Sequence, residues 1–162
     1  MSWEAVVERA LEEGQRLGAV GPGDVAAQID HARVIADRLP ADSGRGLDLG
    51  TGVGLPGLVL AALRPDMEWV LVDAADRRIR VAAAAIAELG WDRRVRAVHG
   101  RAAVLGADPA LVGRMDVVVA RSYGPPATTA EEARPFLREG GQLLVSEPPA
   151  AGGSDRWPVD VV

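Results

Sequence analysis

Two patterns of apolar residues alternate after residue 44. Short, almost continuously apolar runs predict buried strands, and apolar residues spaced three or four apart predict helices between them. This alternation is typical of an α/β fold with a mostly parallel sheet. The predicted strands are 45–50, 68–73, 95–98, 115–120 and 142–147. The predicted helices are 55–63, 77–89 after an Asp76 cap, a short one near 109–112, and 126–138, which Pro135 ends or kinks.

The first 40 residues show a helical pattern. Residues 2–17 place apolar side chains on one stripe and glutamates elsewhere, as in an amphipathic helix. Asp24 can cap a second helix whose apolar positions extend to Leu39. We expect an N-terminal helical extension over 1–40 and an α/β core over 41–162, together one domain. Residues 150–162 show no clear period.

Residues 46–57 are the stretch around which the chain is organised. They read as an apolar strand that carries a carboxylate and ends in closely spaced glycines, followed by a helix whose first turn accommodates Pro56. Glycine is needed where the backbone turns with positive φ, or where a ligand comes too close for a Cβ. The pattern predicts contacts with a nucleotide-like cofactor from Asp48, Gly50, Gly52 and Gly54.

Other polar side chains follow the remaining predicted strands. Asp73 ends the second strand, Arg101–Ala103 follow the third and Arg121–Tyr123 follow the fourth. Ligands of open parallel sheets bind outside the carboxyl ends of the strands, where the strand order reverses. We therefore expect these segments to converge on one crevice, in which the Asp73 carboxylate accepts hydrogen bonds from ribose hydroxyls.

Two cofactor classes fit this arrangement. Residues 52–57 satisfy the Gly-x-Gly-x-x-Gly pattern of nicotinamide and flavin enzymes, but no second domain remains to bind the substrate of an oxidoreductase. The acid-x-Gly-x-Gly-x-Gly pattern over 48–54 is that of S-adenosylmethionine-dependent methyltransferases. That cofactor has a ribose and a cationic methionine end that a nearby carboxylate can hold.

Composition excludes several kinds of site. The chain has no cysteine, and His31 and His99 are isolated, so neither disulfides nor a metal site is predicted. The first residues carry charges where a signal peptide needs an apolar run, and no apolar stretch is long enough to span a bilayer. We expect a soluble, cytoplasmic protein with no membrane partner.

Charge leaves RNA binding open. All 18 basic side chains are arginines, and the formal net charge of −5 does not predict nucleic-acid binding. A local basic face for RNA and a solvated arginine-rich surface both fit the arginines within 77–101. They are Arg77, Arg78, Arg80, Arg93, Arg94, Arg96 and Arg101.

Several segments together resemble one known family. They are Leu47–Ala61 with its Gly-Leu-Pro-Gly turn, Leu71–Asp73 followed by Arg77-Arg78, Val117–Ser122, Pro135–Leu137 and Gly140-Gly141. From about Ile29 to Glu147 the chain resembles the RsmG family, also called glucose-inhibited division protein B. Residues 120–127 resemble a high-GC bacterial branch of that family.

The resemblance implies a Rossmann-like class I S-adenosylmethionine-dependent methyltransferase fold. It implies transfer of a methyl group from S-adenosylmethionine to N7 of a guanine in 16S ribosomal RNA of the small ribosomal subunit, and we expect a monomer that uses no metal. The cofactor contacts implied by the family are Gly50, Leu55, Ala102, Ala103 and Arg121.

Three departures from the family pattern stand out. Ala103 replaces the usual glutamate, an acceptor expected at the adenine end of the cofactor, and losing one hydrogen bond costs about 0.5–1.5 kcal/mol. Residues 146–148 replace the usual Lys-Gly. The chain also stops where family members continue through two more strands. We therefore expect the usual C-terminal hairpin to be lacking, in a fragment or a shortened member.

The reaction asks little of the protein chemically. Guanine N7 has an available lone pair and no proton, so no general base is needed, and the chain has no evident catalytic dyad. We expect Arg121 to be the catalytic positioning group, with an ion pair to a neighbouring acid as the alternative. Tyr123 either stacks on a base or packs against the proline-rich loop. The alternative functions are a small-molecule methyltransferase and a catalytically silent domain that binds RNA or protein.

Overall fold

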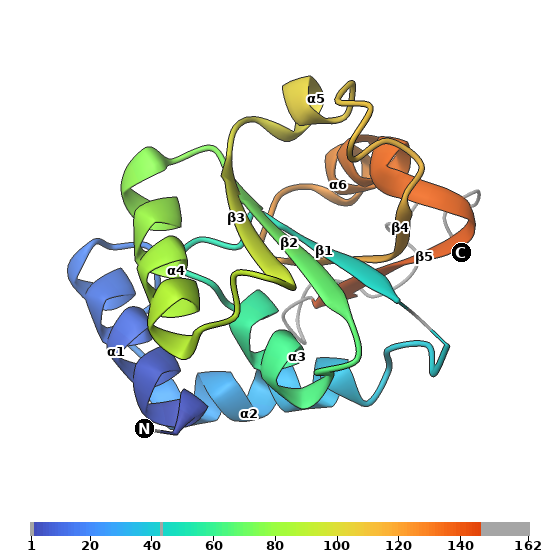
Figure 1. Ribbon diagram of the computed structural model, residues 1–162. Helices are drawn as coiled ribbons and strands as arrows, with labels where there is room; N and C mark the ends of the chain where they lie inside the picture. The colour runs from blue at the N-terminus through green and yellow to red at the C-terminus, as the bar shows by residue number, and fades with distance from the viewer. Residues whose placement is uncertain (1, 43, 147–162) are drawn as a thin grey trace.

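The computed structural model describes residues 2–42 and 44–146, which form a parallel sheet with helices on both faces (Figure 1). The five strands lie in the order β3-β2-β1-β4-β5, and each neighbouring pair is parallel. The order therefore reverses between β1 and β4, which creates a crevice at their carboxyl ends. The strands are β1 (Arg45–Leu49), β2 (Glu68–Asp73), β3 (Val95–His99), β4 (Met115–Arg121) and β5 (Leu137–Ser146).

The helices make two layers around this sheet. Four of them, α1 (Trp3–Arg16), α2 (Val25–Ala36), α3 (Gly57–Leu63) and α4 (Asp76–Leu89), share one apolar core with one face of the sheet. The other face is covered by α5 (Ala102–Leu105), α6 (Pro126–Ala133) and the 3-10 helix η1 (Arg134–Phe136) (Figure 1). The predicted α/β fold with a parallel sheet is confirmed for the described residues.

Both cores take alternate residues of the same strands. Leu71 and Val119 belong to the core under α1–α4, whereas Val70 and Val118 belong to the core under α5 and α6. All four side chains are buried. A strand buried on both faces has no polar alternation, which explains the continuous apolar runs of the sequence.

The N-terminal helices form as predicted and reach the glycine stretch. Asp24 caps α2, because its Oδ1 accepts the N–H of Ala26 at 3.1 Å. In α1, Gly14 lies against the loop after β1, where a Cβ would come 2.7 Å from Cγ2 of Val53 and 2.6 Å from Cγ2 of Val20. The missing side chain lets α1 approach the loop closely.

Two helices begin later or differently than predicted. Residues 51–56 form turns, so α3 begins at Gly57 rather than at residue 55, and Pro56 is its N-cap. At α4 the N-cap is Ala75 rather than Asp76, whose carboxylate instead pairs with Arg80 at 2.7 Å. The turn into α4 is held by Asp73, whose Oδ1 accepts the N–H of Ala75 at 2.8 Å.

Two further local predictions are wrong. Residues 109–112 are turns, because Asp108 accepts the N–H of Ala110 through its side chain and those of Leu111 and Val112 through its carbonyl. The strand expected at 142–147 starts earlier, at Leu137, because a register shift near Gly140 (φ +74°) lets the chain bulge and continue. As predicted, α6 ends just before Pro135.

The expectations for residues 150–162 and for a missing C-terminal hairpin concern parts of the chain outside the described residues. Within 2–42 and 44–146, no helix combines the length and the apolar character needed to cross a membrane.

Candidate functional site

A buried carboxylate holds both ends of the loop after β1. Asp48 has no exposed surface, and its Oδ2 accepts hydrogen bonds from Thr51 Oγ1 at 2.6 Å and from the N–H of Gly57 at 2.7 Å. A Cβ on Gly57 would come 2.7 Å from that same oxygen. Glycine at position 57 therefore allows the end of β1 and the start of α3 to close on one side chain.

The loop glycines adopt a backbone conformation that L side chains rarely adopt. Gly50, Gly52 and Gly54 have φ values of +72°, +61° and +115°. A Cβ on Gly50 would come 2.4 Å from Cδ2 of Tyr123, and one on Gly54 would come 2.4 Å from Cδ1 of Leu58. Gly50 thus lies directly beneath the Tyr123 ring, whereas Gly54 packs against the helix that follows.

Asp73 joins the loop to the neighbouring strand. Its Oδ2 accepts the N–H of Gly52 at 2.8 Å, and its Oδ1 accepts the N–H of Ala75. The residue is 7% exposed. Since each carboxylate oxygen can accept more than one hydrogen bond, acceptor capacity remains for a ligand.

Two adjoining cavities lie at the carboxyl edge of the sheet. The Asp73 cavity, of about 380 Å³, is lined by the predicted site residues Gly50, Asp73, Ala102 and Ala103. The Arg121 cavity, of about 210 Å³, is lined by Gly50, Gly52, Leu55 and Arg121. Gly50, Arg78 and Ser122 line both. The larger one falls in the range of roughly 300–1,000 Å³ found for small-molecule sites.

Two predicted site residues lie outside these cavities. Asp48 and Gly54 line neither of them, and both make contacts that shape the loop. Their direct contact with a cofactor stays a prediction. Both residues instead shape the loop that places Gly50 and Gly52 at the cavities.

Arg121 extends from the end of β4 toward α2. Its Nη2 donates to Oε1 of Gln28 at 3.2 Å, and its buried Nη1 has no hydrogen-bond partner among residues 2–42 and 44–146. Burial lowers the pKa of Arg121, and the charge of Asp48 opposes that shift. Conversely, burial raises the pKa of Asp48 to about 7, against the hydrogen bonds from Thr51 and Gly57.

Several residues of the site were not predicted from the sequence. Glu132 of α6 accepts a hydrogen bond from the Tyr123 hydroxyl, and both residues line the Asp73 cavity. Burial, with Glu132 as the next cause, raises the pKa of Tyr123. Gln28 anchors Arg121 from 93 positions away, and no local spacing could indicate that contact. Thr51 lies only three residues after Asp48, so the spacing alone could have indicated its hydrogen bond to the Asp48 carboxylate.

Comparison with known proteins gives the family. A family model described as rRNA small subunit methyltransferase G matches residues 29–147. The chain belongs to this family. The match covers the predicted site residues and agrees with the extent of the resemblance deduced from the motifs.

Relatives in the family are longer than this chain. The ribosomal RNA small subunit methyltransferase G of Frankia casuarinae is 32% identical over 171 residues, which cover 96% of this chain and 64% of that protein. The protein of the same name from Mycobacterium leprae is 36% identical, with coverages of 85% and 56%. The chain thus spans about three fifths of the length of these relatives.

Solved structures show the same fold. A putative O-methyltransferase from Klebsiella pneumoniae has a TM-score of 0.67 at 20% identity, covering 86% of this chain and 64% of that one. An S-adenosylmethionine-dependent methyltransferase from Thiobacillus denitrificans, solved with S-adenosyl-L-homocysteine, has a TM-score of 0.58 at 25% identity, with coverages of 73% and 48%. The predicted Rossmann-like class I methyltransferase fold is confirmed.

Proposed function

We propose that this chain binds S-adenosylmethionine at the carboxyl edge of its sheet and transfers the methyl group to N7 of a guanine in 16S ribosomal RNA. The observation that carries the proposal is the meeting of Gly50, Asp73, Ala102 and Ala103 in one cavity, in a member of the methyltransferase G family. The reaction belongs to the cytoplasm, where small ribosomal subunits are found, and it needs neither a metal nor a second copy of the chain.

The residues of the Asp73 cavity fit the adenosine half of that cofactor. Asp73 has free acceptor capacity for ribose hydroxyls. At the start of α5 no side chain caps the helix, which leaves the first-turn N–H groups of Ala102 and Ala103 for an acceptor outside it, such as an adenine nitrogen. Gly50 lines both this cavity and the Arg121 cavity, so one cofactor can contact both.

The Arg121 cavity fits the methionine end. Arg121 lines this cavity and supplies the positive charge that the carboxylate of the cofactor would meet. When bound, the cofactor supplies an electrophilic methyl group on a sulfonium. The chain contributes orientation: a guanine held in line with that methyl group reacts through the N7 lone pair, and alignment can lower a barrier by up to about 7–11 kcal/mol.

One observation favours a second candidate, a catalytically silent methyltransferase-like domain that binds RNA. Ala103 lines the Asp73 cavity, so the position where the family resemblance expects a glutamate acceptor carries only a methyl group. Cofactor titration separates the two functions, because a silent domain shows no saturable binding of S-adenosylmethionine.

The direct test is methyl transfer itself. The protein is incubated with labelled S-adenosylmethionine and small ribosomal subunits that lack the modification, and the RNA is digested to nucleosides. We expect labelled 7-methylguanosine, and no incorporation into control subunits already methylated at that position. Label in another nucleoside, or only in small metabolites, would show that the acceptor is different.

A further inference from the structure

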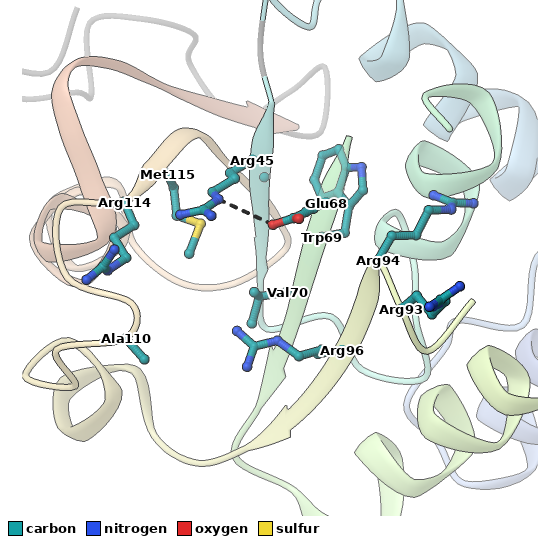
Figure 2. Close-up of a pocket in the computed structure, with 11 residues that line it drawn as sticks. Arg45, Glu68, Trp69, Val70, Arg93, Arg94, Arg96, Ala110, Arg114 and Met115 are labelled. Carbon is teal, nitrogen blue, oxygen red and sulfur yellow. Dashed lines mark ion pairs between the residues drawn. The ribbon is translucent and has the colours of Figure 1, made fainter. Parts of the chain in front are cut away.

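Arginines gather at the end of the sheet opposite the proposed cofactor site. A cavity of about 370 Å³ opens at the amino ends of β1, β2 and β4 and beside β3 (Figure 2). Its lining contains five arginines and a single carboxylate, Glu68. We call it the arginine cavity; its arginines are Arg45, Arg93, Arg94, Arg96 and Arg114.

Some of these charges are already engaged within the protein. Arg45 pairs with Glu68, with 3.3 Å between Nε and Oε2. Arg94 donates to the carbonyl of Ala61 at 2.8 Å and lies over the Trp91 ring. Figure 2 shows Arg93 and Arg94 extending away from the side on which Arg96 and Arg114 lie. Arg96 and Arg114 are therefore the two arginines that supply positive charge inside the cavity.

Arg96 and Arg114 retain donors for a ligand. The Arg96 side chain is exposed and makes no hydrogen bond or ion pair with the part of the chain that the structure describes. Arg114 donates to the Pro109 carbonyl through Nε at 3.0 Å, so its two Nη groups stay available. Arg96 and Arg114 flank buried Val70 and Met115, whose apolar surface strengthens the attraction of these arginines for an anion.

The local charge is opposite to that of the whole chain. The formal net charge is −5, whereas five arginines and one glutamate line this cavity. The nearby carboxylate of Asp116 is occupied by Arg138 and by the N–H groups of Gly44 and Arg45. Planar guanidinium groups match phosphate oxygens with paired donors, so the ligand class that fits is a phosphate.

We propose that the arginine cavity binds backbone phosphates of the RNA substrate, at a second contact remote from the methyl-transfer site. This inference rests on the proposed function. The six residues of β2 separate the amino ends of the strands from their carboxyl ends by about 20 Å, since a strand rises about 3.3 Å per residue. An RNA can span both edges, whereas a small methyl acceptor cannot, so the cavity also favours an RNA substrate.

The test removes two positive charges from the cavity. The variant R96Q/R114Q is compared with R16Q/R38Q, a control that removes the same charge from two exposed side chains, one in the last turn of α1 and one just after α2. Binding of small ribosomal subunits and of a 16S ribosomal RNA fragment is measured over a salt series. Because Arg114 contacts Pro109, the single variant R96E serves as a second test in which no such contact is lost.

We expect R96Q/R114Q to bind RNA at least tenfold more weakly than the native chain, with a salt dependence reduced by about 1.4 to 1.8 in log–log slope for two phosphate contacts. R96E should weaken binding similarly, the control should bind within twofold of the native chain, and affinity for S-adenosylmethionine should not change.

Equal RNA binding by R96Q/R114Q, R96E and the native chain would overturn the inference. It would stay overturned even if the cavity then proved to bind an acidic protein. An equal loss in the control would overturn it too. The proposed function fails separately, if the native chain binds RNA through Arg96 and Arg114 but transfers no methyl group.

Discussion

Single residues of the glycine loop serve the site through close contacts. Gly50 combines a positive φ with a position under the Tyr123 ring, and Asp73 and Asp48 hold the loop by accepting its N–H groups. The sequence was sufficient to predict the need for glycine in the loop and for an acid at the end of β2. It could not show that Asp48 faces the protein interior, because burial depends on helices that pack from elsewhere in the chain.

The Gly50→Ala variant should bind S-adenosylmethionine more weakly. The added Cβ meets both an unfavourable φ and the Tyr123 ring, whereas the same change at Gly18 (φ +67°) meets the unfavourable φ with nothing within 4 Å. We expect G18A to cost about 1 kcal/mol of unfolding free energy. G50A should cost more and weaken S-adenosylmethionine binding at least tenfold. Denaturant unfolding and calorimetric titration check both; equal affinities of G50A and G18A would contradict the placement of the cavity.

Asp48 should make stability depend on pH. Burial raises its pKa from 3.8 to about 7, so between these values the folded chain keeps a proton that the unfolded chain releases. Its contribution to the free energy of unfolding therefore falls as pH rises from 4 to 7, by up to about 4 kcal/mol, and levels off above.

The Asp48→Asn variant isolates this effect. Since asparagine does not titrate, the difference in unfolding free energy between D48N and the native chain should shift in favour of D48N from pH 4.5 to pH 8. Denaturant unfolding at several pH values measures it. A difference that stays constant with pH would show that Asp48 titrates normally.

At the scale of elements, α1 supports the loop that it contacts. The hydrophobic pattern was sufficient to predict α1 and α2, which have a helical period, and the strands, which are short continuous apolar runs. It failed at 109–112 and at the start of β5, where Asp108 and the register shift near Gly140 decide the local structure. Such features depend on the hydrogen bonds of one residue or on one partner strand, and the hydrophobic pattern does not indicate them.

The Gly14→Ala variant tests the contact between α1 and the loop. Helix propensity alone predicts that alanine stabilises α1 by about 1 kcal/mol. Because a Cβ would lie 2.7 Å from Val53, whose branched side chain is buried and stiff, we expect the opposite sign, a loss of unfolding free energy with weaker S-adenosylmethionine binding. Val53→Ala in the same chain should restore part of both. A more stable G14A would refute the contact.

At the scale of the whole molecule, the two proposed binding sites lie at opposite ends of the strands of the sheet. Five of the seven arginines within 77–101 divide between these two ends: Arg78 and Arg101 line the Asp73 cavity, and Arg93, Arg94 and Arg96 line the arginine cavity. Arg45 and Arg114 join the latter from distant parts of the chain. Strand order brings them together, and the sequence alone does not specify that order.

In the proposed function the Asp73 cavity holds the adenosine half of S-adenosylmethionine, with Ala103 at the adenine end. Calorimetric titration of the native chain and of the Ala103→Glu variant with S-adenosylmethionine tests this placement. The predicted effect is a gain in affinity, which a misfolded variant would not show. We expect saturable binding at one site in both, about threefold to tenfold tighter in A103E, as one added hydrogen bond allows. No saturable binding in either protein, or equal affinities in the two, would contradict the account.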